Sequence, residues 1–172
     1  MQQNNTESIS GKQKALRLVA GADSKGQPVF ETVEVIALED KPGYYQLGAS
    51  PLLLRNLARG DIFKVDLENP ADIRVEQRSG NIAVRVFARQ GLELLEQKLT
   101  PEVEKLGGTL DIATPRGLSY SLHVNIGFSA IENLFDGIMA EYLESVWYYG
   151  NVYDPVDGIT PLNWWDQFIN QV

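Results

Sequence analysis

Short hydrophobic runs alternate with turn-forming residues along the first half of the chain, a pattern typical of β-strands. The runs KALRLVA, PVFETVEVIAL, GYYQLGAS, DIFKVDL and DIRVEQRS are rich in β-branched and aromatic residues. Segments such as GADSKGQP, EDKPG and ENPA supply the turns between them. We therefore predict a compact, barrel-like sheet over residues 14–78, preceded by a flexible polar lead-in at residues 1–13.

One short helix is expected within this β-rich part, in the segment ASPLLLRNLARGD. Ser50 can cap the helix, and Pro51 suits its first position. Gly60 ends the hydrophobic run. The segment therefore predicts a helix of one to two turns.

A different pattern begins at Gly80. NIAVRVFA predicts a strand that places Ile82, Val84 and Val86 on one face. In QGLELLEQKLTPEVEKLGG the hydrophobic residues recur every three or four positions, which predicts a helix. Pro101 lies inside it, so we expect a kink or two short helices there. TLDIATP and LSYSLHVNI predict a hairpin around the dipeptide RG.

A long amphipathic helix is predicted to follow. Ser129 and Glu132 have the spacing of a capping box. Hydrophobic residues then recur every three or four positions from Phe128 to Tyr149, which predicts a helix of about 20 residues.

These elements together predict an α+β fold. A short-stranded, barrel-like sheet comes first, and residues 79–150 form a two-layer β-α-β-β-α unit. Residues 151–172 form an acidic, aromatic tail that we expect to pack on this unit.

Charge is distributed unevenly along the chain. The net charge is −8, and the stretch from Gly117 to Val172 contains no Lys or Arg. Seven acidic residues lie in that stretch, and they are the charged candidates for contact with a partner: Glu132, Asp136, Glu141, Glu144, Asp154, Asp157 and Asp166. A negatively charged surface attracts a basic partner and repels nucleic acid.

Aromatic residues accumulate in the same region of the chain. Tryptophan and tyrosine beside charged groups are typical of the residues that dominate binding energy at interfaces. We expect at least one tryptophan of the tail to pack onto the protein itself. The candidate anchors for a partner are Trp147, Tyr148, Tyr149, Trp164 and Trp165.

Candidate catalytic groups are few. The chain has one histidine and no cysteine, which excludes thiolate and multi-histidine metal sites within one chain. His123 shares the polar face of its predicted strand with two serines, and no G-x-S-x-G turn supports a catalytic triad. Carboxylate pairs three residues apart are more typical of a solvated surface than of a hydrolase. We predict no enzymatic activity, no metal and no cofactor.

The hydrophobic runs also bear on the cellular compartment. None approaches the roughly 18 residues that a membrane helix needs. The start, MQQNNTESISGKQK, is polar and lacks the apolar core of a secretory signal. We expect a cytoplasmic protein that does not bind a membrane.

Several short segments resemble a bacterial family known only as a domain of unknown function, DUF4265. They are LARGDIFKVD, RSGNIAVRVF, LGGTLD, the acidic aromatic helix and YYGNVYDP, spread over residues 42–155. The family has no established activity, so the resemblance implies no functional residue. In kind, though not by homology, such a small acidic protein is similar to immunity proteins, which neutralise antibacterial toxins.

Two classes of function follow from these features. In the first, which we favour, an immunity or antitoxin protein binds a basic toxin domain, such as a nuclease, through an acidic aromatic surface. In the alternative, the chain is a regulatory module that binds a small ligand or associates with itself. A carboxylate-dependent hydrolase is a weaker third hypothesis.

Overall fold

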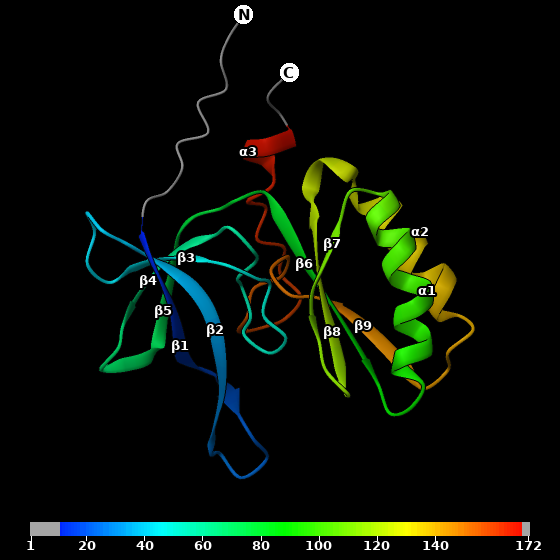
Figure 1. The fold of residues 1–172 in the computed structure, drawn as a ribbon, viewed down its shortest axis with the longest axis horizontal. Coiled ribbons are helices and arrows are strands. Elements are labelled where there is room, and N and C mark those ends of the chain that lie inside the picture. Colours follow the sequence, from blue (N-terminus) through cyan, green and yellow to red (C-terminus); the bar gives the residue numbers. More distant parts are fainter. Residues whose placement is uncertain (1–10, 170–172) are drawn as a thin grey trace, which may run out of the picture.

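The computed structural model describes residues 11–169 and contains two antiparallel sheets (Figure 1). The first sheet has the strand order β1-β2-β3-β4-β5, and its strands are β1 (Gly11–Ala22), β2 (Pro28–Leu38), β3 (Tyr44–Leu47), β4 (Ile62–Asp66) and β5 (Asn69–Gln77). The second has the order β7-β8-β6-β9, and its strands are β6 (Asn81–Ala88), β7 (Thr109–Ala113), β8 (Gly117–His123) and β9 (Ser145–Tyr149).

Helices accompany the second sheet, and the fold is therefore α+β, as predicted. Figure 1 shows α1 (Leu92–Lys105) and α2 (Phe128–Met139) on one side of this sheet. A 3₁₀ turn (Val124–Ile126) precedes α2, and α3 (Asp166–Ile169) lies near the end of the chain. Among the described helices, none is long and apolar enough to cross a membrane.

The first sheet is an open meander in which each strand pairs with the next. Its five strands confirm the predicted ones, although β1 already begins at Gly11, inside the expected lead-in. Residues 1–10 of that lead-in lie outside the described residues. Within the described range, β1 approaches β5 without a hydrogen-bonded ladder, so the predicted barrel does not close. Leu18, Leu47 and Phe63 are fully buried inside its curve.

The hydrophobic face of the second sheet packs against α1 and α2. Ile82, Val84 and Val86 of β6 are fully buried there, as the alternation predicted. Tyr120 of β8 meets Phe135 of α2 edge to face, with ring centroids 5.8 Å apart. This helix-covered layer forms the larger hydrophobic core of the molecule.

The opposite face of the second sheet is also covered, by the loop of residues 48–61 that we call the junction loop. Ser50 of this loop lies 2.6 Å from Ser121 between their hydroxyl oxygen atoms, and its backbone N–H donates to Asp111 Oδ2. The hydroxyl of Ser119 donates to the carbonyl oxygen of Ser50 at 2.7 Å. A buried polar network therefore joins the two sheets. His123 ends this polar face and is partly exposed.

The junction loop contains no helix, so the prediction of a short helix after Ser50 was wrong. Glu31 of β2 accepts the backbone N–H groups of three consecutive residues, Leu52, Leu53 and Leu54, at 2.6–2.9 Å. Asn56 then adopts a left-handed conformation with a φ of 66°. These tertiary contacts override the local helix propensity of the leucines and arginines in the segment.

The helix α1 runs without interruption through Pro101, contrary to the predicted kink or division. Thr100, just before the proline, lies within the same helix. Its hydroxyl contacts Glu96 and the hydroxyl of Tyr120, both at 2.9 Å. Packing against β8 therefore keeps the helix in one piece despite the hydrogen bond that proline removes.

The predicted long helix was wrong in its second half. The helix α2 ends at Met139, and Ser145–Tyr149 forms the strand β9, which pairs with β6. Four of the five residues of β9 are β-branched or aromatic, which suits a strand, and the open edge of β6 supplies its partner. The capping box was also wrong, because Gly127 caps α2 without a side-chain bond. The unit is β-α-β-β-α-β.

Glu31 offers a direct test of what shapes the junction loop. We expect Glu31→Gln to lower the free energy of unfolding by about 2 kcal/mol, because charge-assisted bonds to three amides weaken together. Urea unfolding followed by circular dichroism measures the change. Glu34→Gln, at an exposed position of the same strand, is the control. Equal stability of the two variants would show that the loop holds its course without this carboxylate.

Candidate functional site

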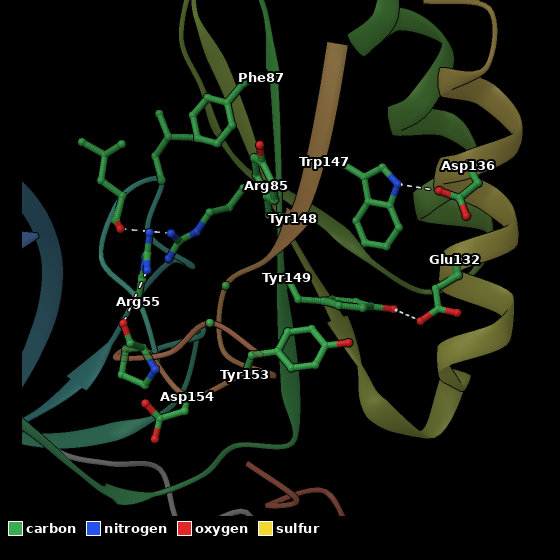
Figure 2. Close-up of a pocket in the computed structure, with 15 residues that line it drawn as sticks. Arg55, Arg85, Phe87, Glu132, Asp136, Trp147, Tyr148, Tyr149, Tyr153 and Asp154 are labelled. Atoms are coloured by element: carbon green, nitrogen blue, oxygen red, sulfur yellow. Dashed lines mark hydrogen bonds between the residues drawn. The ribbon is translucent and has the colours of Figure 1, made fainter. Parts of the chain in front are cut away.

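A cavity of about 620 Å³ opens where the junction loop, the second sheet and the C-terminal tail meet (Figure 2). The tail is the segment after β9, described over residues 150–169. Five segments supply the residues that line the cavity, namely Leu52, Leu53 and Arg55 of the loop, Arg85 and Phe87 of β6, Glu132 and Asp136 of α2, Trp147, Tyr148 and Tyr149 of β9, and Gly150, Tyr153, Asp154, Pro155 and Gly158 of the tail.

Arg85 lies in the middle of β6, on the face turned away from the helices, and only 6% of it is exposed. Its Nη1 donates to the carbonyl oxygen of Leu53 at 3.0 Å. Its Nε and Nη2 are buried and have no hydrogen-bond partner. They lie next to Gly150, where a Cβ would come within 2.9 Å of Nε. Arg85 therefore has a buried guanidinium group in which only Nη1 makes a hydrogen bond.

Burial makes this guanidinium costly. Desolvation lowers the pKa of Arg85 to about 10, the nearby charge of Arg55 acts in the same direction, and that of Glu31 opposes both. The side chain is still charged at neutral pH. A lowering from 12.5 to about 10 corresponds to about 3 kcal/mol of destabilisation of the folded state. Since folding lowers the pKa of this base, the cost is present below pH 10 and disappears as the pH rises above it.

Arg55 brings a second positive charge to the same side of the cavity. It is exposed, and its Nη1 donates to the carbonyl oxygen of Pro155 at 3.4 Å. In the part of the chain that the structure describes, the ion pairs involve neither Arg55 nor Arg85. Two guanidiniums therefore lie near each other without a paired carboxylate.

Two carboxylates, Glu132 and Asp136, and the rings of Trp147 and Tyr149 occupy the opposite side, whereas Asp154 lies near Arg55, as Figure 2 shows. The indole N–H of Trp147 donates to Asp136 at 2.8 Å, and the hydroxyl of Tyr149 donates to Glu132 at 3.1 Å. Burial and the charge of Glu132 raise the pKa of Tyr149 above its usual range. The two rings meet edge to face, with centroids 5.0 Å apart. The strand β9 lies between the two sides of the cavity, since Trp147 and Tyr149 share the helix-covered face of the sheet with Val84 and Val86, and Tyr148 shares the other face with Arg85. The cavity therefore has two arginines on one side of β9 and two acids of α2 on the other.

The structure brings half of the predicted partner-binding residues to this cavity. Glu132, Asp136, Trp147, Tyr148, Tyr149 and Asp154 line it. The other six lie elsewhere. Glu141 pairs with Lys98 at 3.1 Å, and Glu144 accepts from Gln90 at 2.7 Å, so these two acids have partners that the sequence did not suggest.

Asp157 and Asp166 hold local turns of the tail. Asp157 accepts the hydroxyl of Thr160 and the backbone N–H groups of Thr160 and Ile159, and these bonds lower its pKa. Asp166 begins α3. Both carboxylates belong to exposed residues of the tail, outside the cavity lining.

The two adjacent tryptophans close the core beside the second sheet. Trp164 is 9% exposed, and its indole N–H donates to the carbonyl oxygen of Asn151 at 2.7 Å. Trp164 thus packs into the protein's own core and offers little surface to a partner, in line with the expectation that at least one tail tryptophan packs inward. Trp165 is half-buried against Phe128, with ring centroids 5.0 Å apart.

Sequence reasoning missed Arg55 and Arg85, the two residues that give the cavity its positive side. The only signal for Arg85 was a single charge inside the strand NIAVRVFA. Its alternation with valine suggested a solvated face, because nothing in the sequence indicated that the junction loop covers that face. Among residues 11–169, no cluster of three or more His, Asp or Glu residues is arranged to hold a metal.

The energetic cost of Arg85 can be measured. We expect Arg85→Met to raise the free energy of unfolding or change it by less than about 1 kcal/mol, because it removes an incompletely paired buried charge. Any gain in the free energy of unfolding over the wild type should shrink as the pH rises through 10, because Arg85 of the folded wild type then loses its charge. Thermal unfolding between pH 7 and about pH 10.5 measures it. Arg89→Met, at an exposed position just after β6, is the control. A large loss of stability would instead assign Arg85 a purely structural role.

Comparison with known proteins identifies the family and the fold. No curated protein sequence matches the chain. A crystal structure of a hypothetical protein from Neisseria gonorrhoeae is similar in fold, with a TM-score of 0.61 and 17% identity, over 82% of this chain and 96% of the other. Residues 31–146 match a domain of unknown function, a match that ends just before Trp147 and leaves out β9's aromatic residues and the tail. The chain therefore belongs to the DUF4265 family, as its short sequence motifs suggested.

Proposed function

We propose that this protein is a cytoplasmic immunity or antitoxin protein that binds and neutralises a basic toxin domain. The partner would dock on the acidic aromatic face around the cavity mouth and on the adjoining tail. The observation that carries this proposal is the exposure of large hydrophobic side chains among acids, in a stretch of 56 residues without Lys or Arg.

The hydrophobic part of this face is substantial. Tyr148 is 55% exposed and Tyr153 is 41% exposed, and both line the cavity. Val156 and Ile159 of the tail are 94% and 76% exposed, and Leu143, between α2 and β9, is 94% exposed. Leu143 and the tail lie at opposite ends of β9. Exposed hydrophobic side chains close together on a surface, like those of the tail, are typical of protein interaction sites.

The charged part of the face favours a basic partner. Glu141 and Glu144 flank Leu143, and Asp154 and Asp157 flank Val156. Glu141, Glu144 and Asp157 lie outside the cavity lining, so a basic partner would contact them without meeting Arg85. Asp154 lines the cavity next to Pro155, whose carbonyl oxygen accepts from Arg55. Toxin nucleases hold phosphate with Lys and Arg, which makes such a domain a suitable partner.

Charge reversal on this face tests the proposal. The partner is first captured from the native cytosol with the N-terminally tagged protein, identified by mass spectrometry and purified. We expect the double variant Glu141→Lys/Glu144→Lys to slow association with it about ten-fold at low salt, because steering by opposite charges is lost. The difference should vanish at high salt. Surface plasmon resonance at several salt concentrations measures the association rates of the double variant and the wild type.

The control has the same net charge but carries the reversal on the first sheet, at Glu68→Lys/Glu76→Lys, where both residues are exposed. It should associate like the wild type. The proposal fails if the captured partner is acidic, if it is harmless when produced alone, or if both double variants bind equally well.

The cavity favours a second candidate function, a regulatory module that binds a small ligand. Its volume lies in the range of small-molecule sites, and its walls combine aromatic rings with a few converging polar groups. Native mass spectrometry of the protein from its own cytosol would support this candidate by detecting a retained ligand. A stable homodimer would support the self-associating form instead.

A further inference from the structure

We propose that the cavity binds a small molecule with one oxyanion head, a carboxylate or a phosphate, between Arg55 and Arg85, and a flat apolar body against the aromatic walls. This inference rests on the second candidate function and names its ligand class. It is independent of the proposed protein partner.

The unpaired atoms of Arg85 match an oxyanion. Nη1 is occupied by the carbonyl oxygen of Leu53, whereas Nε and Nη2 have no partner. These two nitrogen atoms form one edge of the guanidinium, and their parallel N–H groups can donate to two oxygen atoms of one carboxylate or phosphate. A buried polar group without a partner is rare in folded proteins and calls for an explanation.

The surrounding charges do not supply that partner. Glu31 is close enough to stabilise the charge of Arg85, yet its two oxygen atoms already accept three backbone amides of the junction loop. Arg55 adds a like charge nearby and, like Arg85, belongs to no ion pair in the described residues. An anion between the two guanidiniums would compensate both charges at once.

The remaining walls narrow the ligand class. Phe87 and Tyr148 lie with ring centroids 6.3 Å apart beside Arg85 and offer flat apolar surface. Glu132 and Asp136, beyond β9, and Asp154, next to Pro155, would repel a second negative charge. The ligand therefore carries a single anionic head, and the rest of it is neutral or positive.

Access to Arg85 requires a small adjustment. Its Nε and Nη2 are shielded from solvent and lie next to Gly150. The backbone of Gly150 is held by hydrogen bonds to Ala83 and Asn56, so an oxyanion reaches these nitrogen atoms when the guanidinium shifts toward the cavity. Glycine at position 150 leaves room for this movement. A Cβ there would lie 2.9 Å from Nε and 3.1 Å from Nη2 of Arg85 and would restrict it.

Four probes test this site in isothermal titration calorimetry: benzoate, phenyl phosphate, benzamide and inorganic phosphate. We expect benzoate or phenyl phosphate to bind, and whichever is tighter identifies the head as carboxylate or phosphate. Benzamide, which has the same shape without the charge, should bind at least ten-fold more weakly. Inorganic phosphate should also bind more weakly, because it lacks the ring.

Variants connect the binding to the two arginines. Arg85→Met and Arg55→Met should each weaken the tighter probe about ten-fold or more, while Arg89→Met binds it like the wild type. Thermal unfolding of each variant ensures that lost binding does not reflect lost structure.

Three outcomes would overturn the inference: no binding of either aromatic anion at millimolar concentration, equal binding of benzamide, or full binding by both arginine variants. If native mass spectrometry then detects a retained neutral ligand, the regulatory module stands and only its proposed ligand class is wrong. If it detects no ligand and the probes also fail, the second candidate function fails with the inference.

Discussion

One carboxylate on β2 sets the course of the junction loop, and the contact between the two sheets depends on that course. Glu31 accepts the backbone N–H groups of residues 52–54, so the loop runs flat across the second sheet instead of coiling into a helix. This course brings Ser50 to the hydroxyls of β8 and the carbonyl oxygen of Leu53 to Arg85. A single side chain therefore organises a face of the sheet that would otherwise be solvated.

The tail, like the junction loop, is held to the second sheet by hydrogen bonds. Gly150 extends the pairing of β9 with β6, since its N–H donates to the carbonyl oxygen of Ala83. The side chain of Asn151 then continues this pairing. It accepts a hydrogen bond from the N–H of Ala83 and donates one to the carbonyl oxygen of Asn81, as a neighbouring strand would. Trp164 fixes Asn151 in turn through its indole. The floor of the cavity is thus held by backbone-like bonds, and its shape does not depend on exposed side chains.

The sequence predicted the strands because their signal is local, but it did not predict what covers them. The face of β6 that packs on the helices followed from alternation alone. The opposite face, with Arg85, is buried only because Glu31 and Ser50 act across long separations in the chain. The run from Ser145 to Tyr149 fitted both helical and strand spacing, and the free edge of β6 decided between them. Half of the predicted site residues lie at the cavity, and the aromatic ones among them are there because β9 pairs with β6.

Net charge is a poor guide to what this cavity attracts. The chain carries a net charge of −8, which argues against an anionic ligand at long range. Salt screens that average field within roughly 8 Å, so groups inside the cavity respond mainly to their immediate neighbours. There the fold sets Arg55 and Arg85 against Glu132 and Asp136, residues from distant parts of the chain. An acidic protein can therefore repel nucleic acid and attract a basic protein at its surface, while a desolvated guanidinium inside it still favours a single small anion.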